Sequence, residues 1–465
     1  MLKNAIYSLI PLAVMLLAAE GILTVLGAGS SPATLSRGFD PGVAYIVPDS
    51  SRPGFFQTQM FDGQRREVVI PPRDGRIRVL LFGGSNTESF YGDRLEQSLN
   101  RLRTPGSPEF EVINLGRRGY GSARVAILFR QAMCLHPDLA VIYCGHNEFV
   151  ELGFFEDVEA QLSPGLRVAA GLLSNLRSFN VLVDGIRRLG SGSDTPERWT
   201  DEYERFTHFT FKETLAQLEL YRENLTHICR EAKSHGVQLL LCTVVSNMLS
   251  APFASNLPAD IPPDRAAELA SLLQEVEGLI PSRFAPLVPR DPRDRITFRD
   301  WAPAFWDAAE REGRPKRLRS FLDTVKLFHG RVLSGAEEKD LERARLLLHD
   351  VLEICPDHPL ALFELAMCSY LLREDQVASE QFALAARYDR APRKGSDLTN
   401  EIVTETATAE GVALLDAARV FRAHSPAGIV GWDLMKDECH LQRFGLLMLM
   451  DDLARAILGM RERPR

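Results

Sequence analysis

The chain has 465 residues, of which 45% are hydrophobic and 25% are charged, and its formal net charge is −8. This length suits one large domain with an accessory unit, or two to three domains of ordinary size. Both fractions are typical of globular proteins and argue against a largely disordered chain. The negative net charge argues against nucleic acid as a main partner.

The N-terminal segment is strongly apolar. Residues 5–27 are almost all hydrophobic, carry one charge at Glu20, and form a run about long enough for a helix that spans a membrane. The small residues that follow would also suit a cleaved signal peptide, although the apolar core of such a peptide is usually only about 7–15 residues long. We expect residues 1–28 to be a transmembrane anchor or signal, with a buried helix as the third alternative.

Seven cysteines are spread along the chain without a Cys-x-x-Cys pair, and most lie inside apolar runs. The odd number excludes a complete set of disulfides, and the apolar neighbours predict buried free thiols. An exported domain would meet an oxidising compartment, where unpaired thiols are less common. The cysteines and the N-terminal segment therefore point in different directions.

Five short apolar runs follow a stretch, residues 29–72, that we expect to be a linker or N-terminal extension. The runs are residues 76–82, 110–115, 138–144, 237–245 and 411–417. Helical patterns separate them, and the clearest is 211–236, in which five apolar residues fall near one face: Leu215, Leu218, Leu220, Leu225 and Ile228. Alternating strands and helices predict a three-layer α/β fold with a parallel sheet and a site at the carboxyl ends of its strands.

The stretch between the fourth and fifth runs breaks this alternation. Within it, three apolar residues recur 34 residues later: Ala344, Leu348 and Val351 are followed by Ala378, Phe382 and Ala385. This period is typical of tetratricopeptide repeats, although two ordinary helical hairpins could share the spacing by coincidence. Because so few repeats cannot form a free-standing solenoid, we expect residues 256–394 to be a helical insertion packed on the α/β domain. Such an insertion could bind a protein partner.

Ser85 is the first polar side chain after the first predicted strand, in the sequence LFGGSNTES (residues 81–89). Its hydroxyl could cap the following helix, or it could be a nucleophile. A serine nucleophile needs a histidine that takes its proton and a carboxylate that orients the histidine. Among the ten histidines only His440 has an aspartate, Asp437, three residues before it. At that spacing the carboxylate can reach Nδ1 and leave Nε2 for the serine.

Two further stretches offer donors for an oxyanion, which attack on an ester would generate. The sequence NLGRRGYGS, residues 114–122, is rich in glycines that can expose backbone N–H groups. Asn147 lies in CGHNEF, directly after the third predicted strand.

Together these stretches resemble the SGNH hydrolases, also called GDSL-like lipases and esterases. The matching positions are Ser85 in the first block, Asn114 and Gly119 in the second, Gly145, Asn147 and Glu148 in the third, and Asp437, His440 and Gly445 in the last. Two positions depart from the family pattern. Gly84 stands where the family usually has an aspartate, and Leu441 where it commonly has a proline.

The resemblance covers residues 73–255 and 395–465, and it implies a flavodoxin-like sheet. It implies that Ser85 is the nucleophile, His440 the base and Asp437 its orienting group. The oxyanion donors would be the backbone N–H groups of Ser85 and Gly119 and the Asn147 amide. No cofactor and no metal is expected. The chain as a whole also resembles membrane-anchored bacterial members with tetratricopeptide-like insertions, which implies an extracytoplasmic (periplasmic) catalytic domain.

Candidate substrate contacts are Asn86, His146 and Glu148, although His146 could instead be a loop histidine bonded to backbone. The expected substrate is an O-acylated small molecule, glycan or lipid. Transfer of the acyl group to water would make the protein an esterase, and transfer to a sugar hydroxyl would make it a cell-envelope polysaccharide O-acetyltransferase. A third alternative is a noncatalytic scaffold in which the helical insertion binds a partner protein.

Overall fold

The computed structural model describes residues 15, 17–26, 44–59, 68–151, 176–179, 181–182, 208–255, 257, 261–288 and 316–462. The chain divides into two compact units. Unit 1 comprises Met1–Gly75, Ala123–His136 and Glu151–Phe206, and unit 2 comprises Arg76–Ser122, Pro137–Val150 and Thr207–Arg465. The predicted domain boundaries at residues 28, 72, 255 and 394 stay predictions.

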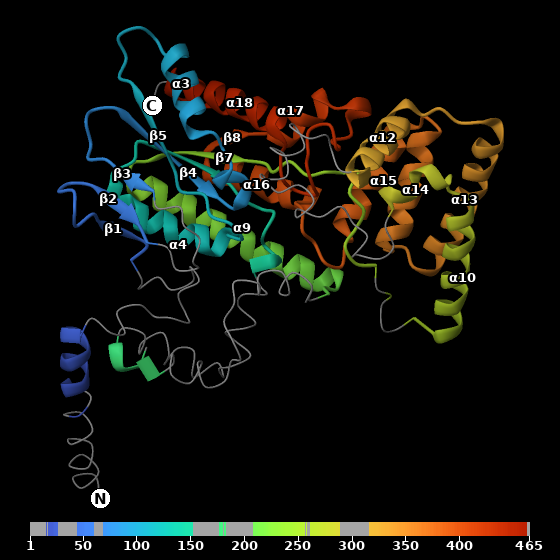
Figure 1. Ribbon diagram of the computed structural model, residues 1–465, viewed down its shortest axis with the longest axis horizontal. Coiled ribbons are helices and arrows are strands. Elements are labelled where there is room, and N and C mark those ends of the chain that lie inside the picture. The colour runs from blue at the N-terminus through green and yellow to red at the C-terminus, as the bar shows by residue number, and fades with distance from the viewer. Residues whose placement is uncertain are drawn as a thin grey trace, which may run out of the picture. The chain divides into compact units, whose positions relative to one another are not determined.

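Unit 2 contains a parallel sheet of five strands (Figure 1). The strands are β4 (Ile77–Gly83), β5 (Phe110–Asn114), β6 (Leu139–Tyr143), β7 (Gln238–Cys242) and β8 (Ala413–Leu415). Their order in the sheet is β5-β4-β6-β7-β8, and every neighbouring pair is parallel. Each strand overlaps one of the five apolar runs, so the predicted parallel α/β sheet is confirmed.

Helices lie on both faces of this sheet. On one side are α3 (Gly92–Leu102), α17 (Ala417–His424) and α18 (Arg443–Glu462), and their apolar residues share a core with the strands. On the opposite side lies α9 (Phe211–Ser234), which packs against β7 and against α16 (Asp397–Glu410) (Figure 1). The sheet thus lies between two layers of helices.

The buried face of α9 differs in part from the predicted one. Leu218, Leu225 and Ile228 are buried, but Leu215 and Leu220 are 45% and 50% exposed. The buried stripe continues through Tyr221, whose hydroxyl donates a 2.7 Å hydrogen bond to the Cys144 carbonyl. The helical period of 3.6 residues then places Leu220 on the solvent side. Leucine content alone did not distinguish the two faces.

A pair of substitutions on α9 tests this burial. Leu218→Ala is expected to lower the free energy of unfolding by about 2–5 kcal/mol, because it leaves a cavity under the sheet. Leu220→Ala removes the same atoms from an exposed position and is expected to change stability by no more than about 0.5 kcal/mol. Urea denaturation of both variants checks this. Equal losses would contradict the assignment of the two faces.

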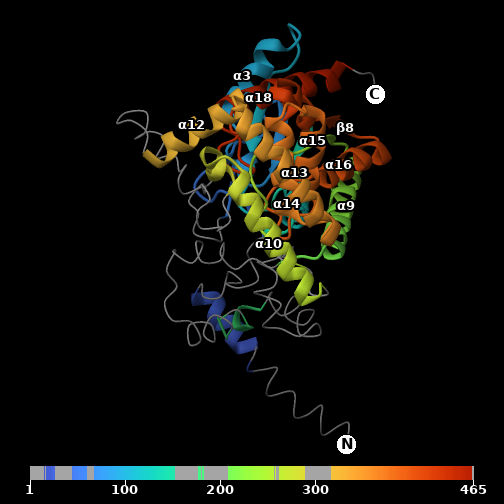
Figure 2. The ribbon, with the colours of Figure 1, turned by 90° about the vertical axis from the view of Figure 1, so that its right-hand side faces the viewer.

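The segment between β7 and β8 contains a cluster of helices, which faces the viewer in Figure 2. They are α10 (Pro263–Leu279), the short 3-10 helix η2 (Ser282–Leu287), α12 (Lys316–Gly330), α13 (Gly335–Ile354), α14 (Pro359–Leu371) and α15 (Asp375–Arg387). Helices α10, α13, α14 and α15 pack in that order. The six residues with the 34-residue period lie on α13 and α15, and all are buried. Assignment of these helices to the tetratricopeptide family stays a prediction.

The stretch predicted as a linker contains a small antiparallel sheet in unit 1. Its strands are β1 (Ile46–Pro48), β2 (Phe56–Thr58) and β3 (Val69–Ile70). The backbone N–H of Tyr45, beside β1, donates to the Gln131 side chain at 2.7 Å, which ties the sheet to α4 (Ser122–Ala132). Strands of two or three residues are too short to give a periodic pattern, so the sequence did not indicate them.

The described part of the N-terminal segment, residues 15 and 17–26, is helical. No helix in the described ranges has both the length and the hydrophobicity needed to cross a membrane. The rest of the predicted segment 5–27 lies outside the described residues, so the anchor stays a prediction. All seven cysteines are free, and six of them are buried, whereas Cys134 is exposed.

Candidate active site

Two glycines place Ser85 at the carboxyl end of β4. A Cβ on Gly83 would lie 2.0 Å from the Tyr143 carbonyl oxygen and 2.2 Å from Thr87 Oγ1. Only glycine therefore lets the turn pack against the end of β6. Gly84 is the N-cap of the four-residue helix α2 (Ser85–Glu88), and no side chain caps this helix. The Ser85 hydroxyl does not serve as a helix cap.

The loop after β5 holds α2 in place. Asn114 Nδ2 donates to the Thr87 carbonyl at 2.6 Å, and Asn114 Oδ1 accepts from the Gly116 N–H at 2.9 Å. A Cβ on Gly116 would lie 2.4 Å from the Glu88 backbone nitrogen. Asn114 thus has a positioning contact with the helix that carries Ser85.

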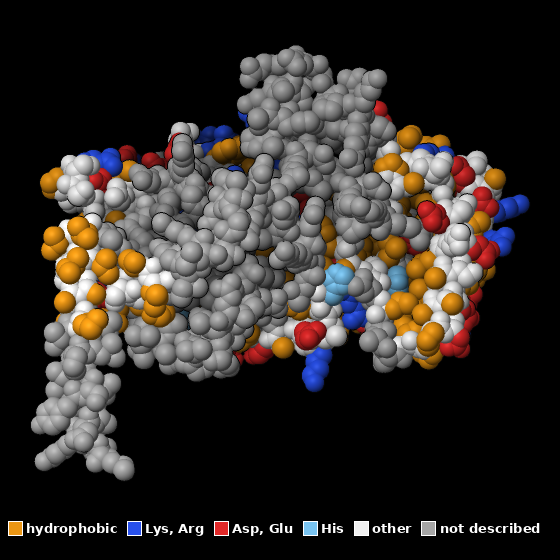
Figure 3. Space-filling model, turned by 60° about the horizontal axis from the view of Figure 1, so that its bottom comes forward, with side chains coloured by type: hydrophobic (Ala, Val, Ile, Leu, Met, Phe, Trp, Pro, Cys, Tyr) orange, Lys and Arg blue, Asp and Glu red, His pale blue; other side chains and the backbone are white. Residues whose placement is uncertain are grey.

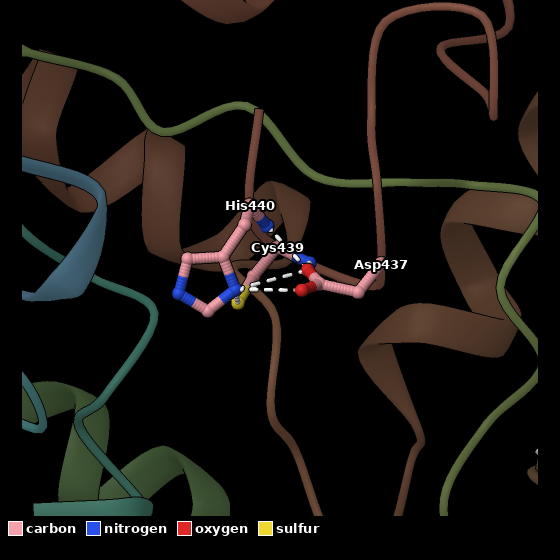
Figure 4. Close-up of side chains that lie close together, drawn as sticks. All are labelled: Asp437, Cys439 and His440. Carbon is pink, nitrogen blue, oxygen red and sulfur yellow. Dashed lines mark hydrogen bonds and ion pairs between the residues drawn. The ribbon is translucent and has the colours of Figure 1, made fainter. Parts of the chain in front are cut away.

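His440 and Asp437 lie beside Ser85. His440 Nε2 is 2.7 Å from Ser85 Oγ, and His440 Nδ1 is 2.9 Å from Asp437 Oδ2. Figure 4 shows the carboxylate facing the ring edge that carries Nδ1. Asp437 Oδ1 also accepts the backbone N–H groups of His440 at 2.6 Å and Cys439 at 3.0 Å. The chain therefore brings together three residues separated by up to 355 positions in sequence.

The charge state of Asp437 follows from these contacts. Burial raises the pKa of Asp437, but the charge of His440 and the hydrogen bonds from His440 and Cys439 outweigh it, so the pKa lies below its ordinary value. The side chain is then a carboxylate, which accepts the proton on His440 Nδ1. The lone pair of Nε2 is left for the Ser85 hydroxyl, as a general base requires.

Asn147, one of the predicted oxyanion donors, lies beside the same turn. Asn147 Nδ2 donates to the Tyr120 carbonyl at 3.0 Å and lies 2.3 Å from the place that a Cβ on Gly84 would take. An amide has two N–H donors, so the second one is available for a ligand beside Ser85. Gly119, next to Tyr120, has a φ of +69°, a left-handed conformation that favours glycine.

The structure revises two candidate substrate contacts, because Asn86 and His146 are buried and bonded to the protein. Asn86 Nδ2 donates to the Cys439 carbonyl at 2.8 Å, and Asn86 Oδ1 accepts the Leu441 N–H at 3.3 Å. Asn86 therefore braces the nucleophile helix against both neighbours of His440. His146 Nε2 is 2.9 Å from the Val245 carbonyl, and His146 Nδ1 is 3.4 Å from Asn86 Nδ2. These contacts of His146 agree with the second interpretation given above, a loop histidine that is hydrogen-bonded to backbone.

The His146 environment predicts a dependence of stability on pH. Burial, with a further contribution from His440, lowers the pKa of His146 from 6.5 to about 4. Between these values the unfolded chain binds a proton that the folded chain does not, so stability falls as pH falls from 6.5 toward 4. The loss amounts to about 3 kcal/mol at about 1.4 kcal/mol per unit of pKa.

Unfolding by urea at neutral pH and at pH near 4 measures this effect. His146→Gln is expected to lack this part of the pH dependence, whereas the same substitution at the exposed His235 is expected to retain it. A variant at position 146 with the wild-type pH dependence would contradict the assignment.

Glu148, the third candidate substrate contact, is also bonded to the protein. Its carboxylate accepts the Ser122 hydroxyl at 2.6 Å and the Ser122 N–H at 3.1 Å, and its side chain is buried. Glu148 therefore holds the start of α4, where a carboxylate is electrostatically favoured. Its neighbour Asn147 is the residue of this loop whose side chain lies against Gly84, next to Ser85.

Within the described ranges, one group of three side chains could hold a metal ion, formed by Asp437, Cys439 and His440 (Figure 4). Cys439 Sγ is 3.4 Å from His440 Nδ1. A metal on Nδ1 would displace the hydrogen bond to Asp437, and burial raises the pKa of the Cys439 thiol, which opposes the thiolate that a metal needs. The arrangement fits a hydrogen-bonded base better than a metal centre.

Sequence reasoning missed Asn247. This residue is fully buried, and its Nδ2 donates to the Asp437 carbonyl at 3.0 Å. It follows the fourth predicted strand by two residues, and a polar side chain at the carboxyl end of a parallel strand was the signal that could have found it.

The comparisons with known proteins add little information about the function of the site. No family model matches the chain, and no curated protein matches it. The chain is similar to the crystal structure of a GDSL-like lipase from Bacteroides thetaiotaomicron VPI-5482, with 10% identity, coverage of 83% of this chain and 89% of that chain, and a TM-score of 0.30. It is also similar to the crystal structure of TesA, with 16% identity, coverage of 54% and 98%, and a TM-score of 0.20. With identities and TM-scores this low, these two structures decide nothing about function, which has to be argued from the site.

Proposed function

We propose that the protein is a serine hydrolase that cleaves carboxylic esters through an acyl-enzyme. The observation that carries this proposal is the continuous chain of contacts from Ser85 Oγ to His440 Nε2 at 2.7 Å and from His440 Nδ1 to Asp437 at 2.9 Å. A hydroxyl, an imidazole and a buried carboxylate in this order form an activated nucleophile.

In the proposed mechanism, Ser85 Oγ attacks the acyl carbon while its proton passes to His440 Nε2. The carbonyl oxygen becomes an oxyanion that accepts hydrogen bonds from the Asn147 amide and from the backbone N–H groups of Ser85 and Gly119. Collapse of this intermediate breaks the ester bond, and the leaving alkoxide takes the proton from His440. A water molecule then attacks the acyl-enzyme by the same route and regenerates Ser85.

The proposed substrates are O-acylated carbohydrates or lipids. If a sugar hydroxyl replaces water in the second step, the same residues perform O-acyl transfer, so the two reactions are separated by product rather than by site. A noncatalytic scaffold is disfavoured, because a scaffold has no need for the aligned contacts between Ser85, His440 and Asp437.

We also propose that the N-terminal segment associates with a membrane and that the catalytic unit is extracytoplasmic. Membrane association is supported by five large apolar side chains that are exposed on the described part of the N-terminal segment: Met15, Leu17, Ile22, Val25 and Leu26. A protein partner at the helical insertion is a further proposal. On the face drawn in Figure 3, hydrophobic side chains gather over the insertion, and Leu346 on α13 is 67% exposed.

The proposed hydrolase is tested with the full-length chain, p-nitrophenyl acetate and a fluorophosphonate probe. We expect the wild type to release p-nitrophenol and to be labelled, and Ser85→Ala to do neither. Ser89→Ala is the matched control, because Ser89 lies on the same turn, is exposed, and its hydroxyl donates to the Ser85 carbonyl and not to His440. Mass analysis with acetylated and free oligosaccharides separates hydrolysis from transfer. If the wild type is inert to both reagents, the proposed function is wrong.

A further inference from the structure

The helical insertion and the loop that carries Asp437 share one core. The core of the insertion includes Leu249 and Ala251 from the loop after β7 and Ile429 and Trp432 from the loop before Asp437. Trp432 Nε1 donates to the Leu249 carbonyl at 3.2 Å, and the Met248 N–H donates to the Val430 carbonyl at 2.9 Å. The two loops are thus held together where the insertion covers them.

Asn247 connects this shared core to the catalytic turn. Its Nδ2 donates to the Asp437 carbonyl, and its backbone N–H donates to the Glu438 carbonyl at 3.0 Å. Its Oδ1 accepts the Leu249 N–H at 3.0 Å. A fully buried amide with these partners has one orientation only, because any rotation would leave buried polar groups without hydrogen bonds. The position of Asn247 therefore fixes the backbone on which the Asp437 carboxylate stands.

Lys394, at the end of the insertion, in turn holds Asn247. Its side chain is 5% exposed, and Nζ donates to the Asn247 carbonyl at 3.0 Å and to the Ser250 carbonyl at 2.6 Å. Burial of an ammonium group is costly unless the group is well hydrogen-bonded. The two carbonyl contacts therefore stabilise the buried charge of Lys394 in addition to its packing. Beside it, the Ser246 hydroxyl donates to the Gly395 carbonyl at 2.7 Å. A Cβ on Gly395 would lie 2.3 Å from Val244 Cγ2, so the segment around Gly395 and the loop after β7 are in direct contact.

We infer that Lys394 is a positioning residue through which the helical insertion orients Asp437 and His440, by way of Asn247. The inference rests on the proposed hydrolase function and deepens it, because it makes the aligned base depend on the insertion. The path consists of Lys394, the Asn247 backbone and amide, and the Asp437 carbonyl.

The test compares Lys394→Met with Lys394→Arg in the full-length chain. Methionine keeps most of the length of the side chain without donors, whereas arginine restores donors to the two carbonyls. We expect Lys394→Met to lower kcat at least tenfold with little change in KM, and Lys394→Arg to recover part of it. The acid limb of the pH profile of kcat/KM should move to lower pH in Lys394→Met, because a displaced carboxylate stabilises the protonated base less. Lys233→Met, at an exposed lysine paired with Glu410, is the matched control and should behave as wild type.

A second measurement does not use an ester substrate. Proton NMR of the full-length chain should show a downfield resonance from the N–H shared by His440 and Asp437, absent in His440→Ala and weakened in Lys394→Met. If Lys394→Met does not fold, Trp432→Phe, which removes the bond to the Leu249 carbonyl and part of the ring system, is expected to give the same changes to a smaller degree. A folded Lys394→Met with wild-type kcat and resonance would overturn the inference. An inert wild type whose resonance still depends on Lys394 would instead overturn the hydrolase alone.

Discussion

Asp437→Asn is expected to lower kcat for ester hydrolysis about 10⁴-fold at neutral pH while leaving KM nearly unchanged. The side chains have the same shape, so the fold is retained. The asparagine oxygen can still accept the backbone N–H groups of Cys439 and His440, which the Asp437 Oδ1 atom accepts now. The NH2 group then faces His440 Nδ1. A donor at that place stabilises the tautomer with the proton on Nε2, which cannot take a proton from Ser85.

Steady-state kinetics with p-nitrophenyl acetate and the rate of fluorophosphonate labelling measure this loss. Asp433→Asn is the control, because it changes a carboxylate in the same loop that has no hydrogen bond to His440 in the described structure. It should retain activity within about an order of magnitude of wild type. A loss in Asp437→Asn of less than tenfold would show that the carboxylate does not orient the base.

Gly84→Ala is expected to lower kcat by about 10²–10³-fold, the usual result of losing one oxyanion donor. The added Cβ would lie 2.3 Å from Asn147 Nδ2 and 3.0 Å from the Tyr120 carbonyl oxygen, so the amide has to move away from Ser85. Gly92→Ala is the matched control. A Cβ there would meet nothing closer than 3.9 Å.

A double-mutant cycle with Asn147→Ala sharpens this prediction. If Gly84→Ala acts by displacing the amide, the double variant should be no worse than Asn147→Ala alone. Additive losses would show that the alanine damages the turn by another route. The same geometry explains why position 84 is a glycine. An aspartate at position 84 would put its Cβ into the Asn147 amide, so this arrangement of Asn147 requires glycine.

Much of the fold could be predicted because its signals are local. The strands β4, β6 and β7 are mostly buried apolar runs, and β4 ends at Gly83. The three-stranded sheet of unit 1 was not predicted, because its short strands lie in a stretch interrupted by prolines and glycines, whereas β8, also of three residues, lies in a longer apolar run. On α9, Leu220 looked like a core residue, and only the packing of Tyr221 against the end of β6 decides which side of the helix is buried.

The site divides in the same way. The serine after two glycines and the Asp-x-x-His spacing are local patterns, and the structure brings Ser85, Asp437 and His440 together. The placement of Asn86 depends on carbonyl and N–H groups more than 350 residues away, and that of His146 on the carbonyl of Val245. No sequence pattern specifies which backbone group an amide will reach across a fold. The position of Asn247 after a predicted strand could have been noticed, but its bond to the Asp437 carbonyl could not be predicted.

The sheet order has a consequence for how the protein reaches its active form. Ser85 follows β4, an inner strand of the sheet, whereas His440 follows β8, an edge strand that comes after the whole helical insertion in the chain. Contacts over such long separations form late and slowly during folding. The proposed nucleophile therefore stays unactivated in any partly folded chain in which the loop that carries His440 has not yet reached Ser85. Reactivity toward a fluorophosphonate would accordingly report completion of folding, and a newly made or refolding chain should acquire it last.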